Sequence, residues 1–323
     1  MSRLGTGLIA AALLTICSNA FALEQVRLAQ NQAPISGISI IAKVKGFFEK
    51  NGLDVSVSNF TTGKQCLDTV MGGGADVATT AESPTTAAAM TKAPIAFLAR
   101  TEYSDLKTVV TVESGIKSPA DLKGKRVAYT AGTGSEVYTW TLLRSASLKP
   151  EDVKLVNLRP QEMIPAMSAG SIDAFNTWEP HISNAKKALG SKVAQLDTKG
   201  MYSETFNIVV MRAYAEKNPK VIHAFLKSLI EAESWMKQNR DEAIAAVASF
   251  ANMKPEDLAP IWDEYVFEVV LDQKVMDVLT THSNWRLSTG NAPPGAAMPD
   301  FKSVILADPL RAVAADRVRM PGL

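Results

Sequence analysis

Short stretches with the two-residue period of a β-strand alternate with stretches of helical period through the first two hundred residues. Strand-like segments lie at 26–29, 53–57, 76–78 and 95–99, with helical patterns between them. After Tyr103 the order restarts, with strand patterns at 108–112, 126–130, 153–158 and 171–175. Such alternation over short connections is typical of an α/β protein whose parallel sheets carry helices on both faces. The sequence therefore predicts two consecutive β/α units.

The remainder of the chain, from residue 207 onward, is predicted to be largely helical. An amphipathic helix follows Pro219, and further helical patterns lie at 243–250, 255–265 and 274–282. With 323 residues, 46% apolar and only 21% charged, the chain is globular and longer than a single hydrophobic core usually requires. We therefore expect two lobes, although no Gly/Ser/Pro-rich linker separates them.

The first 22 residues have the three parts of a secretory signal peptide. Arg3 is followed by an apolar run at 8–16 and by Ala20-Phe21-Ala22, a small-x-small cleavage site. We predict cleavage after Ala22 and a periplasmic mature protein. Two alternatives stay open: an uncleaved anchoring helix, although the run is short for a membrane span, and a lipoprotein acylated at Cys17.

Charge and composition exclude several classes of function. The net charge is +1, and loss of Arg3 with the leader would leave none, so nucleic acid is not an expected partner. Cleavage would leave Cys66 as a single cysteine, predicted to be buried and unreactive. The three histidines show no zinc-binding spacing, and no GxSxG nucleophile motif is present. We therefore expect no metal, no cofactor and no enzyme activity.

Two turns between a strand and a helix are candidates for ligand binding. The segment 132–136 (Gly-Thr-Gly-Ser-Glu) joins a strand to a helix, which leaves backbone N–H groups and two hydroxyls available. Helix N-termini of this kind suit anionic or strongly polar groups, and open α/β sheets bind ligands at the carboxyl ends of their strands. The segment 32–36 is the equivalent turn of the first unit. Each turn could equally be an ordinary capped helix start.

Several segments together resemble the periplasmic solute-binding proteins of the nitrate, sulfonate, taurine and thiamine-precursor family. Their order and spacing carry the resemblance, which extends over nearly the whole mature chain; the segments are 29–55, 71–78, 116–127, 170–180, 218–221 and Asn284-Trp285. The resemblance implies a bilobal periplasmic-binding-protein type II fold, with two mostly parallel sheets flanked by helices and a hinge between the lobes. Lobe 1 would comprise 23–104 plus 208–323, and lobe 2 the inserted segment 105–207.

The resemblance also implies a function and a set of binding residues. The protein would be a monomer that closes over a small solute and delivers it to the permease and ATPase subunits of an ABC importer. Trp178 would form a flat wall of the site, and the hydroxyls and amides would bind the polar head of the solute. The candidate ligand-binding residues are Gln32, Ser36, Glu82, Ser83, Thr133, Gly134, Ser135, Trp178, Glu179 and Asn207.

Glu82 and Glu179 bear on the class of solute. Two carboxylates facing the solute would repel a bare anion, so a zwitterion, an aminated sulfonate or a pyrimidine-like thiamine precursor is favoured over nitrate. Two other functions remain as alternatives. Fungal thiamine-pyrimidine synthases share this fold, but their cysteine-rich iron site has no counterpart here. An exported ligand-sensing partner of a membrane receptor would use the same site as a transporter.

Overall fold

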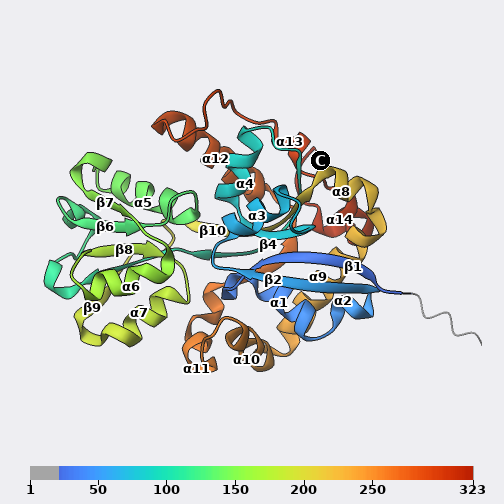
Figure 1. Cartoon of the computed structure of the whole chain (residues 1–323), viewed down its shortest axis with the longest axis horizontal. Coiled ribbons are helices and arrows are strands. Elements are labelled where there is room, and N and C mark those ends of the chain that lie inside the picture. The colour runs from blue at the N-terminus through green and yellow to red at the C-terminus, as the bar shows by residue number, and fades with distance from the viewer. Residues whose placement is uncertain (1–21, 323) are drawn as a thin grey trace, which may run out of the picture.

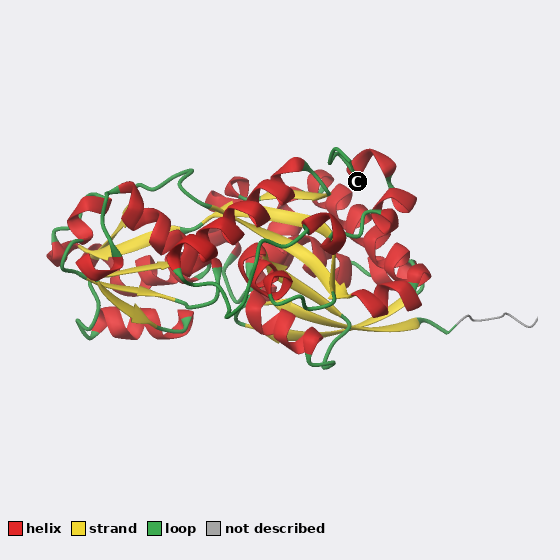
Figure 2. Ribbon diagram, turned by 90° about the horizontal axis from the view of Figure 1, so that it is seen from above, coloured by secondary structure: helices red, strands yellow, loops and turns green. Residues whose placement is uncertain are grey.

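The computed structural model of the chain describes residues 22–322. The predicted signal peptide therefore lies, apart from Ala22, outside the described residues. Within residues 22–322, no helix is both long enough and apolar enough to cross a membrane. Figures 1 and 2 show two lobes side by side, joined by extended segments of the chain.

The larger lobe is built on a six-stranded sheet, in the order β11-β4-β10-β3-β1-β2. Its middle strands are buried along almost their whole length, which agrees with their nearly continuous runs of apolar and small residues. The strands are β1 (Glu24–Asn31), β2 (Leu53–Phe60), β3 (Val77–Ala81), β4 (Ile95–Asp105), β10 (Ser203–Met211) and β11 (Val266–Val270).

The smaller lobe is built on a five-stranded sheet, in the order β7-β6-β8-β5-β9. Its strands are β5 (Lys107–Thr111), β6 (Arg126–Tyr129), β7 (Lys154–Asn157), β8 (Ala174–Thr177) and β9 (Val193–Leu196). Successive residues of its central strands enter two separate apolar clusters, because side chains alternate between the faces of a sheet. One face carries Val110, Val127 and Ala174, and the other carries Val109, Ala128 and Phe175.

Both sheets are mixed, whereas the sequence predicted mostly parallel sheets. In the larger sheet β1 is parallel to β2 and β3, but β10 and β11 pair antiparallel with their neighbours. In the smaller sheet β6 is parallel to β7 and β8, while β5 is antiparallel to β8 and β9. The antiparallel pairs involve the strands through which the chain leaves one lobe and returns to it. The predicted α/β bilobal class is confirmed.

Helices cover both sheets, as the alternating pattern indicated (Figure 1). In the larger lobe, α9 packs against α1, α2 and β11, and Phe48 stacks on Phe225 at a centroid distance of 4.9 Å. The helices are α1 (Gly37–Val44), α2 (Phe47–Lys50), α3 (Gly63–Met71), α4 (Glu82–Met90), α5 (Gly134–Ser145), α6 (Pro160–Ser168), α7 (His181–Leu189), α8 (Arg212–Lys217), α9 (Pro219–Gln238), α10 (Arg240–Phe250), α11 (Pro255–Leu258), α12 (Gln273–Thr289), α13 (Phe301–Val304) and α14 (Asp308–Val313).

The chain passes between the lobes twice, and the two crossings lie next to each other. The outgoing crossing is Leu106, between β4 and β5, and the return crossing lies between β9 and β10. The Leu106 N–H donates to the Tyr202 carbonyl at 3.2 Å, and Asp105 accepts from the Ser203 hydroxyl at 2.6 Å. Because β10 begins at Ser203, residues 203–207 belong to the six-stranded sheet rather than to the inserted segment.

Two local predictions differ from the structure. The strand β11 was not predicted, because its residues Val266–Val270 follow a long helical pattern without a turn signal. The single helix expected at 255–265 is a short α11 followed by a 3-10 helix at Ala259–Glu264. Pro260 explains the break, since a proline inside a helix removes a backbone hydrogen bond.

Candidate functional site

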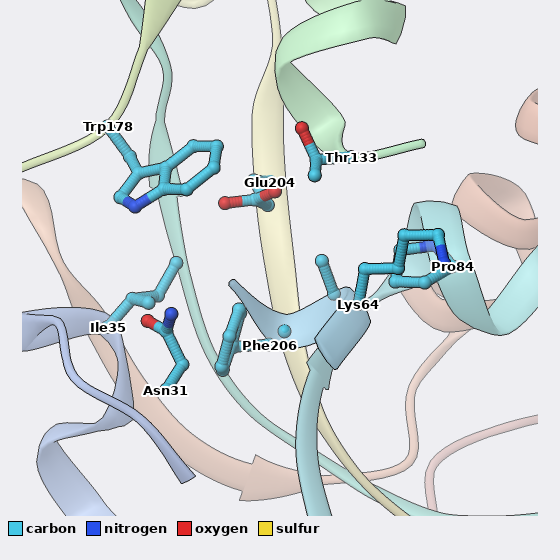
Figure 3. Close-up of a pocket in the computed structure, with 10 residues that line it drawn as sticks. Asn31, Ile35, Lys64, Pro84, Thr133, Trp178, Glu204 and Phe206 are labelled. Atoms are coloured by element: carbon cyan, nitrogen blue, oxygen red, sulfur yellow. The ribbon is translucent and has the colours of Figure 1, made fainter. Parts of the chain in front are cut away.

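A narrow pocket lies between the lobes, and both lobes contribute to its walls (Figure 3). Its free volume is about 10 Å³, which is roughly the space for one water molecule. We call it the inner pocket. Its lining residues are Asn31, Ile35, Gly63, Lys64, Ala81, Pro84, Glu204 and Phe206 from the larger lobe, and Thr133 and Trp178 from the smaller.

Trp178, one of the predicted binding residues, lines the inner pocket from the end of β8. Its side chain is buried and meets the ring of His181 edge-on at 6.2 Å. Although β8 belongs to the smaller lobe, Trp178 packs with the apolar core of the larger one. In Figure 3 its indole lies above Ile35 and beside the Glu204 carboxylate. The indole is therefore both a wall of the pocket and part of the contact between the lobes.

Thr133, also predicted, lines the inner pocket as the N-cap of α5. Its hydroxyl donates to the Thr130 carbonyl at 2.8 Å and accepts from the Ser135 N–H at 3.2 Å. Ser135 is fully buried, and its hydroxyl donates to the Asn176 carbonyl at 2.6 Å. Both hydroxyls thus fix the turn between β6 and α5, and Ser135 itself does not line the pocket.

Glu204 is the acidic side chain that lines the inner pocket, and the sequence did not single it out. It lies in β10, and Figure 3 shows its carboxylate between Trp178 and Thr133. Only 3% of the residue is exposed. Burial raises the pKa of its carboxyl group well above the usual range, and the charge of Glu82 raises that pKa further. Protonation of Glu204 is therefore favoured well above the pH at which a free glutamate ionises.

Glu82, predicted to face the solute, is bonded within the larger lobe. Its carboxylate accepts from the Tyr202 hydroxyl, and from the Thr205 N–H and hydroxyl at 2.7 and 2.8 Å. His282 Nε2 lies 3.5 Å from Oε1. Burial raises the pKa of Glu82, although these hydrogen bonds offset part of the rise. Glu82 does not line the inner pocket.

Glu179 is likewise engaged elsewhere. It accepts from Lys107 Nζ at 3.2 Å and from the Ser183 N–H, in the first turn of α7, at 2.9 Å. Lys107 also pairs with Glu264 of the larger lobe at 2.5 Å. Burial lowers the pKa of Lys107, but the charges of Glu179 and Glu264 outweigh that effect and raise it. Glu179 therefore belongs to an ion-pair group next to the crossings.

Gln32 and Ser36 lie in the first turn as predicted, but their side chains bind the protein. Gln32 Nε2 donates to the Phe250 carbonyl at 3.2 Å. The Ser36 and Thr79 hydroxyls are 3.3 Å apart, and Ser36 is buried. Neither residue lines the inner pocket, whereas their neighbours Asn31 and Ile35 do.

Ser83 and Asn207 are also buried next to the pocket. The Ser83 hydroxyl accepts from Arg286 Nη2 at 3.1 Å. Asn207 Nδ2 donates to the Thr80 carbonyl at 3.2 Å, while its Oδ1 has no partner in the described chain. Gly134 lies beside the pocket, against the Glu204 carboxylate. A direct role of these residues in binding stays a prediction.

Lys64 is a pocket residue that the sequence did not single out, although its position between a strand and a helix is a recognisable signal. It lies in the first turn of α3, directly after β2, and so occupies a third turn between strand and helix. Thr62 caps this helix by accepting from the Gln65 N–H at 3.2 Å. Lys64 Nζ pairs with Asp68 at 2.5 Å, with both side chains about half exposed. The turn 61–64 thus brings a cation to the edge of the inner pocket.

In the described part of the chain, no group of three or more histidine, cysteine or acidic residues is placed to hold a metal ion. Cys66 is buried as predicted, and burial raises the pKa of its thiol. The inner pocket instead combines an indole wall, a hydroxyl, an amide, a carboxyl group and a lysine. Such a set can hold a small polar molecule in a defined orientation.

The fold is the one found in periplasmic binding proteins. The alkanesulfonate-binding protein of Xanthomonas axonopodis pv. citri, solved bound to MOPS, matches with a TM-score of 0.77 and 19% identity over 88% of this chain and 98% of that one. The aliphatic sulphonate binding protein of Escherichia coli matches with a TM-score of 0.73 and 24% identity, over 88% and 92%.

Sequence comparison gives the family. The taurine-binding periplasmic protein of Escherichia coli is 29% identical over 223 residues, covering 66% of this chain and 68% of that protein. The family model described as NMT1/THI5 like matches residues 34–243. The chain belongs to the NMT1/THI5-like family, and the predicted resemblance is confirmed. The relatives and solved structures described above are, by name, binding proteins for taurine or sulfonates.

Proposed function

We propose that this protein is the exported solute-binding component of an ABC importer. The observation that carries the proposal is the inner pocket, whose walls come from two lobes joined only by adjacent crossings. With a free volume of about 10 Å³, it cannot admit an organic solute unless the lobes separate. Opening and closing about the crossings would capture and release the solute, as in other hinged proteins.

The lining residues favour a small organic solute with a polar head and an apolar or planar part. Trp178, Ile35 and Phe206 would contact the apolar part. Thr133, Asn31 and Glu204 would bind the polar groups, and Glu204 would accept a hydrogen bond from an amine or a ring N–H when ionised. These contacts fit a taurine-like sulfonate, another zwitterion or a thiamine-pyrimidine-like molecule better than nitrate.

A screen of solutes tests the proposal directly. Thermal shift measurements would cover sulfonates, amino acids, nitrate, pyrimidines and aromatic acids, followed by calorimetry of each compound that raises the melting temperature. We expect one class to bind with one-to-one stoichiometry and to be recovered unchanged by mass spectrometry. A chemically altered solute would contradict a binding role and support an enzyme. Failure of every class to bind would contradict the proposal as a whole.

Export and assembly are separate parts of the proposal. Mass spectrometry of the protein from a periplasmic extract should find Leu23 as the first residue. A monomer in light scattering and solute uptake that depends on a permease and an ATPase encoded nearby would support the importer. Binding of the same solute without uptake, together with capture by a membrane receptor, would indicate the sensing role instead.

A further inference from the structure

A second pocket lies next to the inner pocket, at the outer edge of the contact between the lobes. Its free volume is about 290 Å³. Lys64 and Pro84 line both pockets, while Arg286, Pro293 and Gly132 line only the second. We call it the outer pocket. Because Gly132 belongs to the smaller lobe and the other four to the larger, movement of the lobes would change its shape.

Arg286 of α12 is a buried cation without an acidic partner in the described chain. It is 6% exposed. Its guanidinium donates only to neutral oxygens, at 3.1 Å to the Ser83 hydroxyl, 3.4 Å to the Ser83 carbonyl and 3.3 Å to the Asn291 carbonyl. Its Nε is buried and has no hydrogen-bond partner. Within residues 22–322, no carboxylate oxygen lies within 4 Å of Arg286.

A buried charge of this kind is costly unless it is paired. The other deeply buried arginine, Arg100, obeys that rule, since it pairs with Asp272 at 2.6 Å and with Glu268 at 3.4 Å. Burial lowers the pKa of Arg286, and the charge of Glu136, across the contact between the lobes, offsets part of that effect without forming an ion pair. Arg286 therefore has an unused capacity to bind an anion.

The surroundings of the outer pocket add to this capacity. Lys64 supplies a second cation, and Asp68, which pairs with it, is the acidic residue among the lining side chains. The lining thus has an excess of one positive charge when these three side chains are ionised. The inner pocket, by contrast, carries Glu204. Lys64 lines both pockets, so it lies between the acidic Glu204 of the inner pocket and the unpaired Arg286 of the outer pocket.

We propose that Arg286, together with Lys64, binds an oxyanion group of the solute in the outer pocket. This inference rests on the proposed function, because it assigns the acidic end of the solute that the lobes would enclose. A sulfonate, carboxylate or phosphate oxygen would accept from the free Nε and from the weakly engaged Nη groups of Arg286. The remainder of the solute would extend past Lys64 and Pro84 toward Trp178 and Glu204.

Titration with simple probes tests the site without knowledge of the natural solute. Calorimetry at constant ionic strength would use sodium sulfate, taurine and ethanesulfonate, with ethanolamine as the matched probe without an acidic group. We expect the three anions, and not ethanolamine, to bind the wild-type protein. Arg286→Gln should weaken their binding by about 10- to 100-fold, the usual effect of losing charge-assisted hydrogen bonds. Arg159→Gln removes an exposed arginine from the smaller lobe and should leave affinity unchanged.

Two further variants keep the test decisive if Arg286→Gln fails to fold. Lys64→Gln removes the exposed cation of the same pocket and should weaken sulfate binding by several-fold. Asp68→Asn removes the carboxylate that competes for Lys64 and should strengthen it. Opposite effects of these two variants support the site even without data on Arg286. Equal sulfate affinity in the wild-type protein and both variants would overturn it.

The outcomes separate this inference from the proposed function. If an organic solute binds equally well to the wild-type protein and to folded Arg286→Gln, the anion site is wrong and the binding role stands. If a pyrimidine binds and none of the three anions does, the anion site is again wrong and the binding role again stands. If sulfate binds through Arg286 but no organic solute binds, the anion site stands and the proposed function is contradicted.

Discussion

Gly134 of the smaller lobe lies directly against the carboxylate of Glu204 in the larger lobe. A Cβ added to Gly134 would overlap Glu204 Oε1 and would lie 3.2 Å from the Tyr202 hydroxyl. The φ angle of Gly134 is outside the left-handed region, so any residue could adopt this backbone conformation. Glycine is therefore needed here because a side chain at this position would occupy the space in which the two lobes meet.

Gly134→Ala should weaken solute binding while the fold remains intact. The added methyl group would keep the lobes from reaching this approach, whereas alanine is well suited to the first turn of α5. We expect an increase in dissociation constant of about tenfold or more, measured by calorimetry with the best solute from the screen. Small-angle scattering should show a larger radius of gyration for the variant in the presence of solute.

Gly72→Ala is the matched control for this variant. Gly72 is the C-cap of α3, away from the smaller lobe, and a Cβ there would approach only the carbonyl oxygens of its own helix, at 3.3 Å or more. Its solute affinity should equal that of the wild-type protein. Unchanged affinity of Gly134→Ala would mean that the two lobes do not need this contact to hold the solute.

The raised pKa of Glu204 predicts a pH-dependent effect on stability. In the unfolded chain its carboxyl group ionises near pH 4.3, but burial and the charge of Glu82 keep it protonated to higher pH in the folded protein. The folded state then binds more protons, so stability is fully present below about pH 4.3 and is lost as pH rises toward the folded pKa. Glutamine resembles the protonated acid and should avoid this loss.

Glu204→Gln should therefore raise the melting temperature more at pH 8 than at pH 5. Burial lowers the pKa of His282 to about 3, so His282 makes the opposite contribution to the pH dependence of stability. Comparing the variant with the wild-type protein at each pH cancels this contribution. We expect a difference of about 1–5 °C at pH 8 and a smaller one at pH 5, where the loss has only begun. Glu151→Gln, an exposed control on the smaller lobe, should show no difference at either pH. A constant offset across this range would show that Glu204 ionises normally.

Trp178 should contribute to solute binding as well as to folding. Loss of its indole wall in Trp178→Ala should weaken binding by about 1–3 kcal/mol, which is about 5- to 150-fold in dissociation constant. Calorimetry at a concentration of folded protein fixed by circular dichroism would measure the effect. Because Trp178 also packs in the core, Trp178→Phe provides a variant that keeps most of the packing. If only the free energy of unfolding falls and folded protein binds normally, Trp178 is a core residue.

The elements of the fold could largely be predicted because they depend on local patterns. The turn from β6 into α5 was recognised from its small residues, and Thr133 caps α5 as that reading requires. Trp178 was recognised at the end of a strand that points toward the partner lobe. Both residues line the inner pocket, because the carboxyl ends of strands in the two sheets face each other.

The charges around the pocket could not be predicted, because each depends on contacts distant in the sequence. Glu179 is neutralised by Lys107, and Glu82 is bonded to Tyr202 and Thr205, more than a hundred residues away. Glu204 reaches the pocket only because β10 returns between β3 and β4. A sequence pattern shows where an acidic residue lies along the chain, but not which partner it meets after folding.

Two ion pairs bridge the lobes, and they should favour the closed arrangement. Lys107 pairs with Glu264 at 2.5 Å, and Lys187 of α7 pairs with Asp257 of α11 at 3.1 Å. Because at least one member of each pair is exposed, each should stabilise this arrangement by less than about 1 kcal/mol. The double variant Asp257→Asn/Glu264→Gln should therefore raise the dissociation constant of the solute by about 2- to 10-fold, through a smaller population of closed protein. Its affinity should also depend less on salt than that of the wild-type protein, since fewer charges remain to be screened.

Asp263→Asn is the control, because Asp263 pairs with Arg240 within the larger lobe, at 2.9 Å. Calorimetry between 20 mM and 500 mM sodium chloride measures both effects, and parallel salt curves for the wild-type protein and the double variant would contradict a role for these pairs in closure.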